Sequence, residues 1–243
     1  MKNISIIGLG KVGISLCAAL LNSKFKVFVS DKNQNLISKY KNKIYPFYEP
    51  GVKKIINKNY KNLIFCENSK KMINDTDLTF IIVPTNSNKK GGFSNKYILD
   101  VFNEIKDEFI KKKRFHTFVI VSTVVPGSSK IQIIPHIEKI TKKKINKSFG
   151  LCYNPSFIAQ GEILNGITNP IFSLIGYSSK KSLKILKNII KLIVKNKSQI
   201  LEMSLTEAEI TKLASNTYET MRVSFVNMIA QISNEIGNTN VDK

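Results

Sequence analysis

The stretch Gly8-Leu9-Gly10-Lys11-Val12-Gly13 lies between an apolar run at 4–7 and a second apolar run at 14–21. Glycines at this spacing, between a strand and a helix, allow a tight turn in which the backbone approaches a pyrophosphate and the helix packs closely on the strand. The phosphates would then lie at the positive end of the helix. The order of strand, glycine turn and helix predicts a dinucleotide-binding βα unit.

An acidic residue follows the turn at the distance that a dinucleotide requires. A second predicted strand at 26–30 ends immediately before Asp31. A carboxylate about 20 residues beyond the glycine turn accepts hydrogen bonds from the ribose hydroxyls of the adenosine. Asp31 would repel a 2′-phosphate and therefore favours NAD, although Lys32 beside it leaves room for NADP. The alternative is an ordinary βα turn followed by an N-capping aspartate.

The apolar pattern continues as alternating strands and helices. Helical spacing occurs at 34–40, 52–56, 97–110, 129–140 and 180–194, and strand patterns occur at 62–66, 78–83, 117–122, 149–153, 171–176 and 199–202. Repeated βα units build a mostly parallel, doubly wound sheet that is covered on both faces and binds ligands beyond the carboxyl ends of its strands. The predicted fold class is therefore α/β, of the Rossmann type.

A long helix is predicted at the end of the chain. It begins at a capping box, Thr206-x-x-Glu209, and stops before Gly237, a suitable residue just past a helix end. Its apolar residues recur every three to four positions over about 30 residues, or ~45 Å of helix. This stripe is too much contiguous apolar surface for a monomer, so we expect a homo-oligomer that forms through 206–236.

The formal net charge of +21 does not by itself predict nucleic-acid binding. Every basic residue except Arg114 and Arg222 is a lysine, and the lysines are spread along the whole chain. A nucleic-acid surface would be richer in arginine, clustered basic residues and exposed aromatic side chains. We therefore expect no nucleic acid among the partners.

The cysteines and the apolar segments bear on the cellular compartment. The three cysteines are Cys17, Cys66 and Cys152. Their odd number and wide separation predict buried thiols in a reducing cytoplasm, with neither a disulfide framework nor a metal site. Lys2 and the apolar stretch to Leu21 mimic a signal peptide, but the glycines and Lys11 interrupt that stretch. No stretch approaches the length of a membrane-spanning helix, so no membrane association is expected.

Five further motifs occur in order along the chain. They are Pro46-Phe47-Tyr48-Glu49-Pro50-Gly51, Val83-Pro84-Thr85, Ser122-Thr123-Val124-Val125-Pro126-Gly127, Tyr153-Asn154-Pro155-Ser156-Phe157-Ile158-Ala159-Gln160-Gly161 and Ala208-Glu209-Ile210-Thr211-Lys212-Leu213-Ala214-Ser215-Asn216. With the glycine turn, they resemble the UDP-glucose/GDP-mannose dehydrogenase family over essentially the whole chain. The resemblance implies an NAD-dependent enzyme that oxidises the C6 alcohol of a UDP- or GDP-linked sugar to the carboxylate, in two hydride transfers, through a thiohemiacetal and a thioester on a cysteine.

The resemblance also implies roles for individual residues. The implied cofactor-binding residues are Gly8, Gly10, Lys11, Val12, Gly13, Asp31, Lys32, Val83, Thr85, Thr123 and Gln160. The implied substrate-binding residues are Ser156, Phe157, Ile158, Ala159, Lys212 and Asn216, and the implied catalytic residues are Lys212, Asn216 and Thr123.

The spacing of Lys212 and Asn216 supports their pairing. Positions four apart share a helix face, so an ammonium and a carboxamide can point at one oxygen as it gains negative charge. A hydrated lysine would act as an electrostatic stabiliser, and a desolvated one would be able to act as a base. The alternative is a solvated surface lysine.

The chain departs from the family pattern in two places. Ser156 stands where many members have glutamate, and a hydroxyl of ordinary pKa is poor at proton transfer. The family's nucleophilic cysteine, in a glycine-rich loop followed by Pro-Lys-Asp, has no counterpart in this sequence. The resemblance therefore implies the N-terminal half of a longer enzyme, inactive alone and without the UDP- or GDP-binding domain. This half would comprise an NAD-binding domain over 1–200 and the start of a central helical dimerisation domain over 201–243.

Two other functions stay open at this stage. A 3-hydroxyacid or 6-phosphogluconate type of dehydrogenase shares a nucleotide domain followed by long helices, but the chain after residue 200 is too short to build its substrate site. A non-catalytic NAD-binding or assembly module would explain the missing cysteine.

Overall fold

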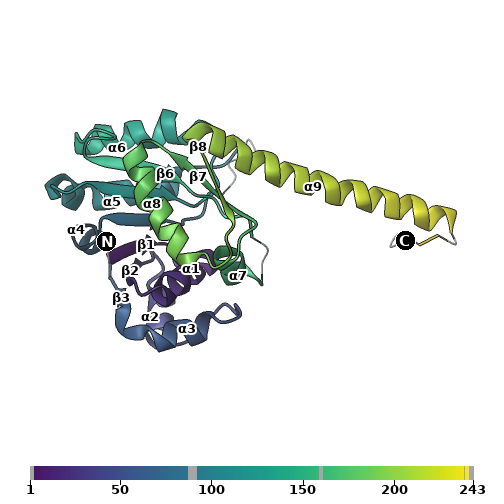
Figure 1. The fold of residues 1–243 in the computed structure, drawn as a ribbon, viewed down its shortest axis with the longest axis horizontal. Helices are drawn as coiled ribbons and strands as arrows, with labels where there is room; N and C mark the ends of the chain where they lie inside the picture. The colour runs from purple at the N-terminus through teal and green to yellow at the C-terminus, as the bar shows by residue number, and fades with distance from the viewer. Residues whose placement is uncertain (1–2, 87–91, 159–160, 238, 241–243) are drawn as a thin grey trace.

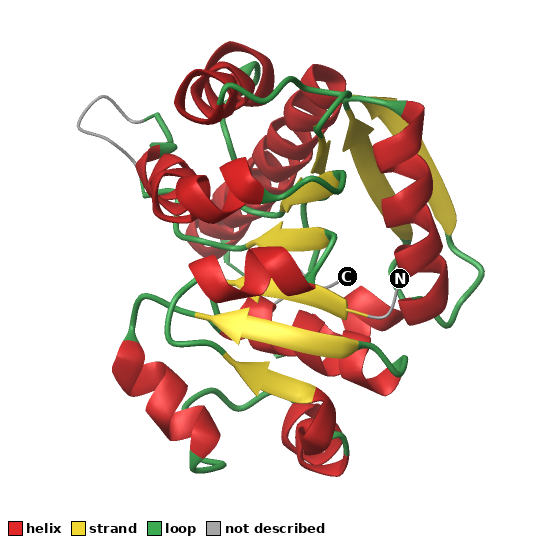
Figure 2. Ribbon diagram, turned by 90° about the vertical axis from the view of Figure 1, so that its left-hand side faces the viewer, coloured by secondary structure: helices red, strands yellow, loops and turns green. Residues whose placement is uncertain are grey.

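The computed structural model describes residues 3–86, 92–158, 161–237 and 239–240, and its centre is one eight-stranded sheet. Helices cover both faces of the sheet, and the last helix projects from the domain (Figure 1 and Figure 2). The strands are β1 (Asn3–Ile7), β2 (Lys26–Ser30), β3 (Leu63–Phe65), β4 (Leu78–Ile81), β5 (His116–Ile120), β6 (Phe149–Tyr153), β7 (Phe172–Tyr177) and β8 (Gln199–Ser204). The helices are α1 (Lys11–Asn22), α2 (Gln34–Lys41), α3 (Val52–Lys58), α4 (Lys70–Asp75), α5 (Lys96–Lys111), α6 (Ile134–Thr141), α7 (Ile163–Thr168), α8 (Lys180–Ile193) and α9 (Leu205–Ile236), with a 3₁₀ turn η1 (Tyr60–Asn62) and a π-helical segment η2 (Ser128–Ile133).

The strands lie in the order β3-β2-β1-β4-β5-β6-β7-β8. Neighbouring strands are parallel except β6 and β7, which are antiparallel. The direction of winding reverses between β1 and β4, so the connections that leave these two strands diverge and a crevice forms beyond their carboxyl ends. The prediction of an α/β, doubly wound, mostly parallel sheet of the Rossmann type is confirmed.

Buried apolar side chains fill both layers between the sheet and the helices. On one face α1 and α8 pack against the strands, and on the other face α5 and α6 do so. Strand residues such as Ile6, Phe80 and Phe118 are buried. Because a parallel sheet covered on both sides has no solvated face, its strands are continuous apolar runs in the sequence.

Three helical segments differ from the sequence prediction. The sequence does not predict α4 and α7, because a helix of six residues is too short to display a 3.6-residue period. The helix predicted over 129–140 begins as the π-helical segment η2 and becomes α-helical only at Ile134. Pro135 has no N–H to donate to the preceding turn, which favours the change of helix type here.

The start of α9 corrects one predicted cap. The capping box is formed by Ser204 and Glu207, not by Thr206 and Glu209. The Ser204 hydroxyl accepts from the Glu207 N–H at 3.3 Å, and the Glu207 carboxylate accepts from the Ser204 N–H at 2.8 Å. The predicted helix end is confirmed, because α9 stops at Ile236 and Gly237 adopts a φ of 73°.

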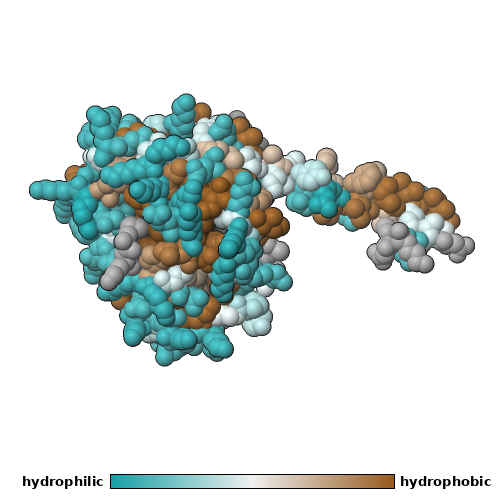
Figure 3. Space-filling view, in the orientation of Figure 1, coloured by the Kyte–Doolittle hydropathy of each residue, from teal (hydrophilic) through white to brown (hydrophobic). Residues whose placement is uncertain are grey.

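The first two turns of α9 pack against the domain. Its buried residues are Leu205, Ala208, Glu209 and Lys212. Beyond them the helix extends away from the domain (Figure 1), and its far end displays apolar side chains (Figure 3). The exposed apolar stripe comprises Ile210, Tyr218, Met221, Val223, Phe225, Val226, Met228, Ile229, Ile232 and Ile236. The structure thus leaves uncovered the surface that the sequence predicts to drive self-association.

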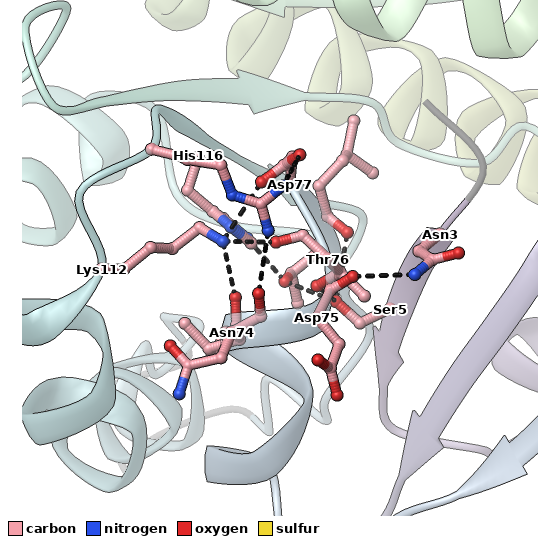
Figure 4. A network of polar contacts seen from close by, with 12 residues as sticks. Asn3, Ser5, Asn74, Asp75, Thr76, Asp77, Lys112 and His116 are labelled. Atoms are coloured by element: carbon pink, nitrogen blue, oxygen red, sulfur yellow. Dashed lines mark hydrogen bonds and ion pairs between the residues drawn. The ribbon is translucent and has the colours of Figure 1, made fainter.

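A buried polar network joins the amino ends of β1, β4 and β5 (Figure 4). Thr79 Oγ1 lies 2.7 Å from Ser5 Oγ and 2.8 Å from His116 Nε2. Lys112 Nζ donates to two backbone carbonyls at the end of α4, each at 2.8 Å, and lies 3.1 Å from the Asp77 carboxylate. This network lies at the edge of the sheet opposite the crevice, where it satisfies buried polar groups.

Candidate functional site

The glycine turn after β1 is built so closely that two of its glycines admit no side chain. A Cβ on Gly8 would lie 2.1 Å from the carbonyl oxygen of Ile82, and a Cβ on Gly13 would lie 2.0 Å from the carbonyl oxygen of Gly8. Gly8 also has a φ of 98°, which favours glycine. Gly10 differs, because a Cβ there would meet no atom of the described residues within 4 Å. The turn is therefore fixed by close packing on two sides and leaves open space at Gly10.

That open space lies at the amino end of α1. Gly10 is the N-cap residue of α1 and provides no side-chain cap, and the first turn of the helix contains no acidic residue. The first N–H groups of a helix carry partial positive charge and attract anions when no side chain caps them. A space that a Cβ would occupy, in front of an uncapped helix end, suits a pyrophosphate. These residues therefore fit a bound dinucleotide.

Asp31 supports the turn from the end of β2. Its Oδ2 accepts from the Leu9 N–H at 2.7 Å and its Oδ1 accepts from the Asn33 N–H at 2.8 Å. Tyr40 donates its hydroxyl to the Leu9 carbonyl at 3.1 Å. Each carboxylate oxygen has a second lone pair, so a half-buried Asp31 can still accept from ribose hydroxyls. Lys32, beside it, is exposed.

The loops after β4 and β5 are joined by one hydroxyl. Ser122 Oγ donates to the Val83 carbonyl at 2.6 Å and accepts from the Val83 N–H at 3.0 Å. Thr85 and Thr123, which follow in these two loops, are half-buried at the same edge of the sheet. The sequence motif includes Ser122 but indicates no role for it. In the structure, its hydrogen bonds to Val83 hold these two loops together.

Lys212 is buried where α9 meets the loop after β6. Its Nζ donates to the Ser156 carbonyl at 2.7 Å and lies 4.5 Å from the centre of the Phe157 ring, and only 8% of the residue is exposed. Burial lowers the pKa of Lys212 below its ordinary 10.5. The solvated surface lysine considered from the sequence is therefore wrong. Asn216 lies one turn further along α9 and is exposed.

The loop after β6 contains several of the predicted substrate-binding residues, and their surroundings differ. Phe157 packs against Phe172, with ring centroids 4.9 Å apart, and a Cβ on Gly166 would come within 2.3 Å of the Ile158 side chain. Val12 and Phe157 line a pocket of about 70 Å³ between α1 and this loop. These apolar side chains thus pack within the protein and support the loop after β6. The predicted residues Ala159 and Gln160 lie outside the described residues.

The three cysteines are free and buried, as predicted. Burial raises the pKa of each thiol, and that of Cys152 reaches about 12. A thiol with a raised pKa is a poor nucleophile, because the reactive species is the thiolate. In the part of the chain that the structure describes, no group of His, Cys, Asp and Glu side chains is arranged to hold a metal ion.

The uncapped glycine turn, the carboxylate after β2 and the sheet order together define a Rossmann-type dinucleotide-binding domain. Residues 2–194 match the NAD binding domain of the UDP-glucose/GDP-mannose dehydrogenase family, and residues 206–243 match its central domain. The chain belongs to this family. The resemblance drawn from the motifs and the prediction of NAD as cofactor are thereby confirmed.

Individual relatives and solved structures agree with this assignment. The chain is 31% identical over 240 residues to GDP-mannose 6-dehydrogenase of Pseudomonas aeruginosa. The matched region covers 96% of this chain and 53% of that protein. It is 24% identical to a UDP-glucose 6-dehydrogenase of Haloferax volcanii, with 96% and 55% covered. A ternary complex of the P. aeruginosa GDP-mannose dehydrogenase superposes with a TM-score of 0.90 at 30% identity, over 98% of this chain and 54% of that one. The chain thus spans about half the length of these relatives.

Proposed function

We propose that this chain supplies the cofactor-binding half of an NAD-dependent nucleotide-sugar 6-dehydrogenase, which oxidises the C6 alcohol of a UDP- or GDP-linked sugar to the carboxylate. The observation that carries the proposal is Lys212, a buried ammonium that contacts the loop after β6 at the carboxyl edge of the cofactor-binding sheet. Family membership gives no support to the 3-hydroxyacid or 6-phosphogluconate alternative.

NAD, when bound, accepts the hydride that leaves C6. The chain's own residues bind the cofactor and orient the substrate. The open face at Gly10 receives the pyrophosphate, and Asp31 accepts from ribose hydroxyls. Lys212 donates one of its three N–H bonds to Ser156, which leaves two for a substrate oxygen that gains negative charge. Because burial favours the neutral amine, Lys212 is also suited to receive the hydroxyl proton.

Two of the predicted residues have secondary parts in this proposal. Asn216 lies four residues after Lys212 and so shares its helix face, where its amide can donate to the same oxygen. Ser156 contacts Lys212 through its backbone carbonyl rather than its hydroxyl. Its side chain is therefore available for a hydrogen bond to substrate, and proton transfer falls to Lys212 or to water.

We expect the chain to bind NAD more tightly than NADP, because the Asp31 carboxylate repels a 2′-phosphate. Asp31→Ala is expected to weaken NAD binding roughly ten- to hundredfold, which corresponds to the loss of a charge-assisted hydrogen bond of about 1.5–3 kcal/mol. Calorimetric titration of both dinucleotides tests this, with Asp100→Ala in α5 as a matched control that leaves NAD affinity unchanged. Equal or tighter binding of NADP would contradict the assignment.

A fusion tests the activity. We would join this chain to the C-terminal part of the P. aeruginosa GDP-mannose 6-dehydrogenase that lies beyond the matched region, and follow NADH formation by absorbance. The expected result is NADH formation from GDP-mannose by the fusion, and no sustained turnover by the 243-residue chain alone with GDP-mannose, UDP-glucose or UDP-N-acetylmannosamine. We infer that contacts to the nucleotide end of the substrate come from the part of the relative that this chain does not match, and such positioning contributes about 7–11 kcal/mol in favourable cases.

Two outcomes would reject the proposed activity, and a third would reject the argument about positioning. A folded fusion that binds NAD but forms no NADH from GDP-mannose would favour the non-catalytic NAD-binding module. NADH formation from 3-hydroxyisobutyrate or 6-phosphogluconate would favour the alternative dehydrogenase class. Sustained turnover of a sugar nucleotide by the unfused chain would show that the positioning argument is wrong.

A homodimer formed through the apolar stripe of α9 is part of the proposal. We expect the chain to self-associate at about 50 µM, because the stripe exposes contiguous apolar surface. Phe225→Glu with Ile232→Glu places charges in the stripe and should give a monomer in sedimentation velocity. The control, Gln231→Glu with Asn234→Glu, adds the same charge to polar exposed positions and should leave association intact. A wild-type chain that sediments as a monomer would rule out association through α9.

The division into domains and the location complete the proposal. β8 belongs to the sheet, so we place the end of the NAD-binding domain after Ser204 rather than at residue 200, and the start of the helical dimerisation domain in α9. Three free, buried thiols suit a reducing cytoplasm. None of the helices in the described ranges is long and apolar enough to cross a membrane.

A further inference from the structure

Glu209 forms a contact that the proposed chemistry does not use. Its side chain is fully buried. Its Oε2 accepts from the Gly127 N–H at 2.6 Å and its Oε1 accepts from the Ser129 N–H at 2.9 Å, across 82 and 80 residues of sequence. These two N–H groups stand at the amino end of the helical segment formed by η2 and α6, where the positive end of the helix dipole favours a carboxylate. Glu209 therefore binds α9 to the loop that follows β5.

The same two turns of α9 make two other contacts with the domain. Lys212, three residues after Glu209, donates to Ser156 in the loop after β6. Ala208 packs so closely on β7 that a Cβ on Gly176 would lie 2.7 Å from its Cβ. The start of α9 thus bridges the loops after β5 and β6. Since the buried residues of α9 end at Lys212, the contacts of its first two turns hold the Lys212 amine in place.

The geometry at Glu209 requires a carboxylate of this length. Two buried N–H groups need two acceptor oxygens, and a buried donor left without an acceptor is costly. Glutamine would offer one oxygen and would point its NH₂ group at the second N–H. Aspartate would retain both oxygens but is shorter by one methylene, so it can reach the two donors only if α9 moves toward them. The two contacts therefore specify the position of α9 as well as its attachment.

We propose that Glu209 is a positioning residue, which couples the loop after β5, the loop of Thr123, to the first turns of α9 and thereby holds the Lys212 amine at the carboxyl edge of the sheet. The inference deepens the proposed function and rests on it for its catalytic meaning. The placement of Lys212 by Glu209 is measurable on the 243-residue chain without any turnover.

Pulsed acetylation of lysines, followed by mass spectrometry, measures this placement site by site. For each lysine, the acetylation rate is plotted against pH. The midpoint of this curve gives the pKa of the amine, and the height of the curve reports how accessible the amine is. In the wild-type chain the midpoint of Lys212 should lie below that of an exposed lysine such as Lys96. In Glu209→Gln the labelling rate of Lys212 should rise roughly tenfold, and its midpoint should rise to that of Lys96, because a released α9 hydrates the amine. Glu209→Asp should give a smaller change in the same direction.

The direction of the shift separates positioning from a direct charge effect. Loss of a neighbouring negative charge would by itself lower the midpoint of an amine, whereas release of α9 raises it. The matched control is Glu207→Gln, which also removes a carboxylate that accepts a backbone N–H, here that of Ser204, but at an exposed site at the start of α9 itself. Glu207→Gln should leave the labelling rate and the midpoint of Lys212 unchanged.

Lys112 serves as an internal reference for general unfolding, because it is buried in the network at the opposite edge of the sheet. Unchanged rate and midpoint of Lys212 in Glu209→Gln would overturn the proposal. A parallel rise of Lys112 labelling in both Glu209→Gln and Glu209→Asp would overturn it as well, because the effect would then be global. If Lys212 proves dispensable for turnover in the fusion, the proposed catalytic role of Lys212 fails, and absence of turnover in a folded fusion that binds NAD rejects the proposed function, while in either case the labelling result on Glu209 stands by itself.

Discussion

Replacement of Lys212 by alanine in the fusion is expected to reduce NADH formation from GDP-mannose roughly 10²- to 10³-fold, the usual effect of removing one donor that stabilises a developing oxyanion. NAD affinity should stay within about twofold, because the residues that we propose to contact the dinucleotide lie in other loops. The buried ammonium is held in place before the reaction by the Ser156 carbonyl. It therefore needs little reorganisation when charge develops on the substrate oxygen.

The pH profile of the fusion distinguishes the two roles of Lys212. If the neutral amine removes the hydroxyl proton, kcat rises with pH until the lowered pKa of Lys212 is passed. If the ammonium only stabilises the oxyanion, kcat falls above that pKa. Lys212→Arg retains the charge with a group that does not deprotonate, so it should rescue part of the rate only in the second case. Lys184→Ala, at an exposed lysine of α8, is the control. Full activity of Lys212→Ala would remove Lys212 from the reaction.

The cofactor turn was predictable because its information is local. Gly8, Gly10 and Gly13 lie within six residues, and the close approach at Gly13 is to the carbonyl oxygen of Gly8 in the same turn, whereas Gly8 approaches the carbonyl oxygen of Ile82 after β4. Asp31 follows from the length of one βα unit. A short contiguous motif of this kind can be recognised in a sequence without knowledge of the rest of the fold.

The surroundings of Lys212 and Glu209 were not predictable in this way. The chain contains 38 lysines and arginines, and nothing in the residues beside Lys212 distinguishes a buried lysine from an exposed one. Both Ser204-x-x-Glu207 and Thr206-x-x-Glu209 match a capping box. The choice between them depends on Gly127 and Ser129, which are distant in sequence and meet Glu209 only after the sheet has formed.

The direction of β7 shows the same limit. Its apolar residues Phe172, Leu174 and Ile175 predict a strand, but such a pattern is the same for parallel and antiparallel pairing. The connection between the antiparallel strands β6 and β7 contains the six-residue helix α7, which the sequence pattern does not reveal. Because β7 and β8 then carry the chain to the start of α9, this one reversal determines which edge of the sheet Lys212 reaches.

Acidification between pH 6.5 and 4.5 is expected to destabilise the folded chain through His116. Its ring is fully buried against Phe118, with ring centroids 4.6 Å apart, in the network of Figure 4. Burial lowers the pKa of His116 well below 6.5, and the charges of Lys112 and Arg114 lower it further, while a hydrogen bond to the Thr76 backbone partly offsets them.

The sign of the effect follows from proton linkage. Above pH 6.5 the histidine is neutral in both states and contributes no pH dependence. Below pH 6.5 the unfolded chain binds a proton that the folded chain does not, so the free energy of unfolding falls with a slope that approaches about 1.4 kcal/mol per pH unit. Glu108, Glu202 and Glu207 have pKa values lowered below 4.5, so their contributions are lost only in more acidic solution. The window from pH 6.5 to 4.5 therefore isolates the histidine.

Urea unfolding at several pH values within this window measures the slope, and the two histidines of the chain provide their own control. His116→Gln should flatten the slope whatever it does to absolute stability, because the buried titrating group is gone. His136→Gln should retain the wild-type slope, since His136 is a surface residue that bonds Asn103 at 2.9 Å. A wild-type slope that survives in His116→Gln would assign the acid sensitivity to the carboxylates, and would show that the network at the amino ends of the strands accommodates a charged imidazole.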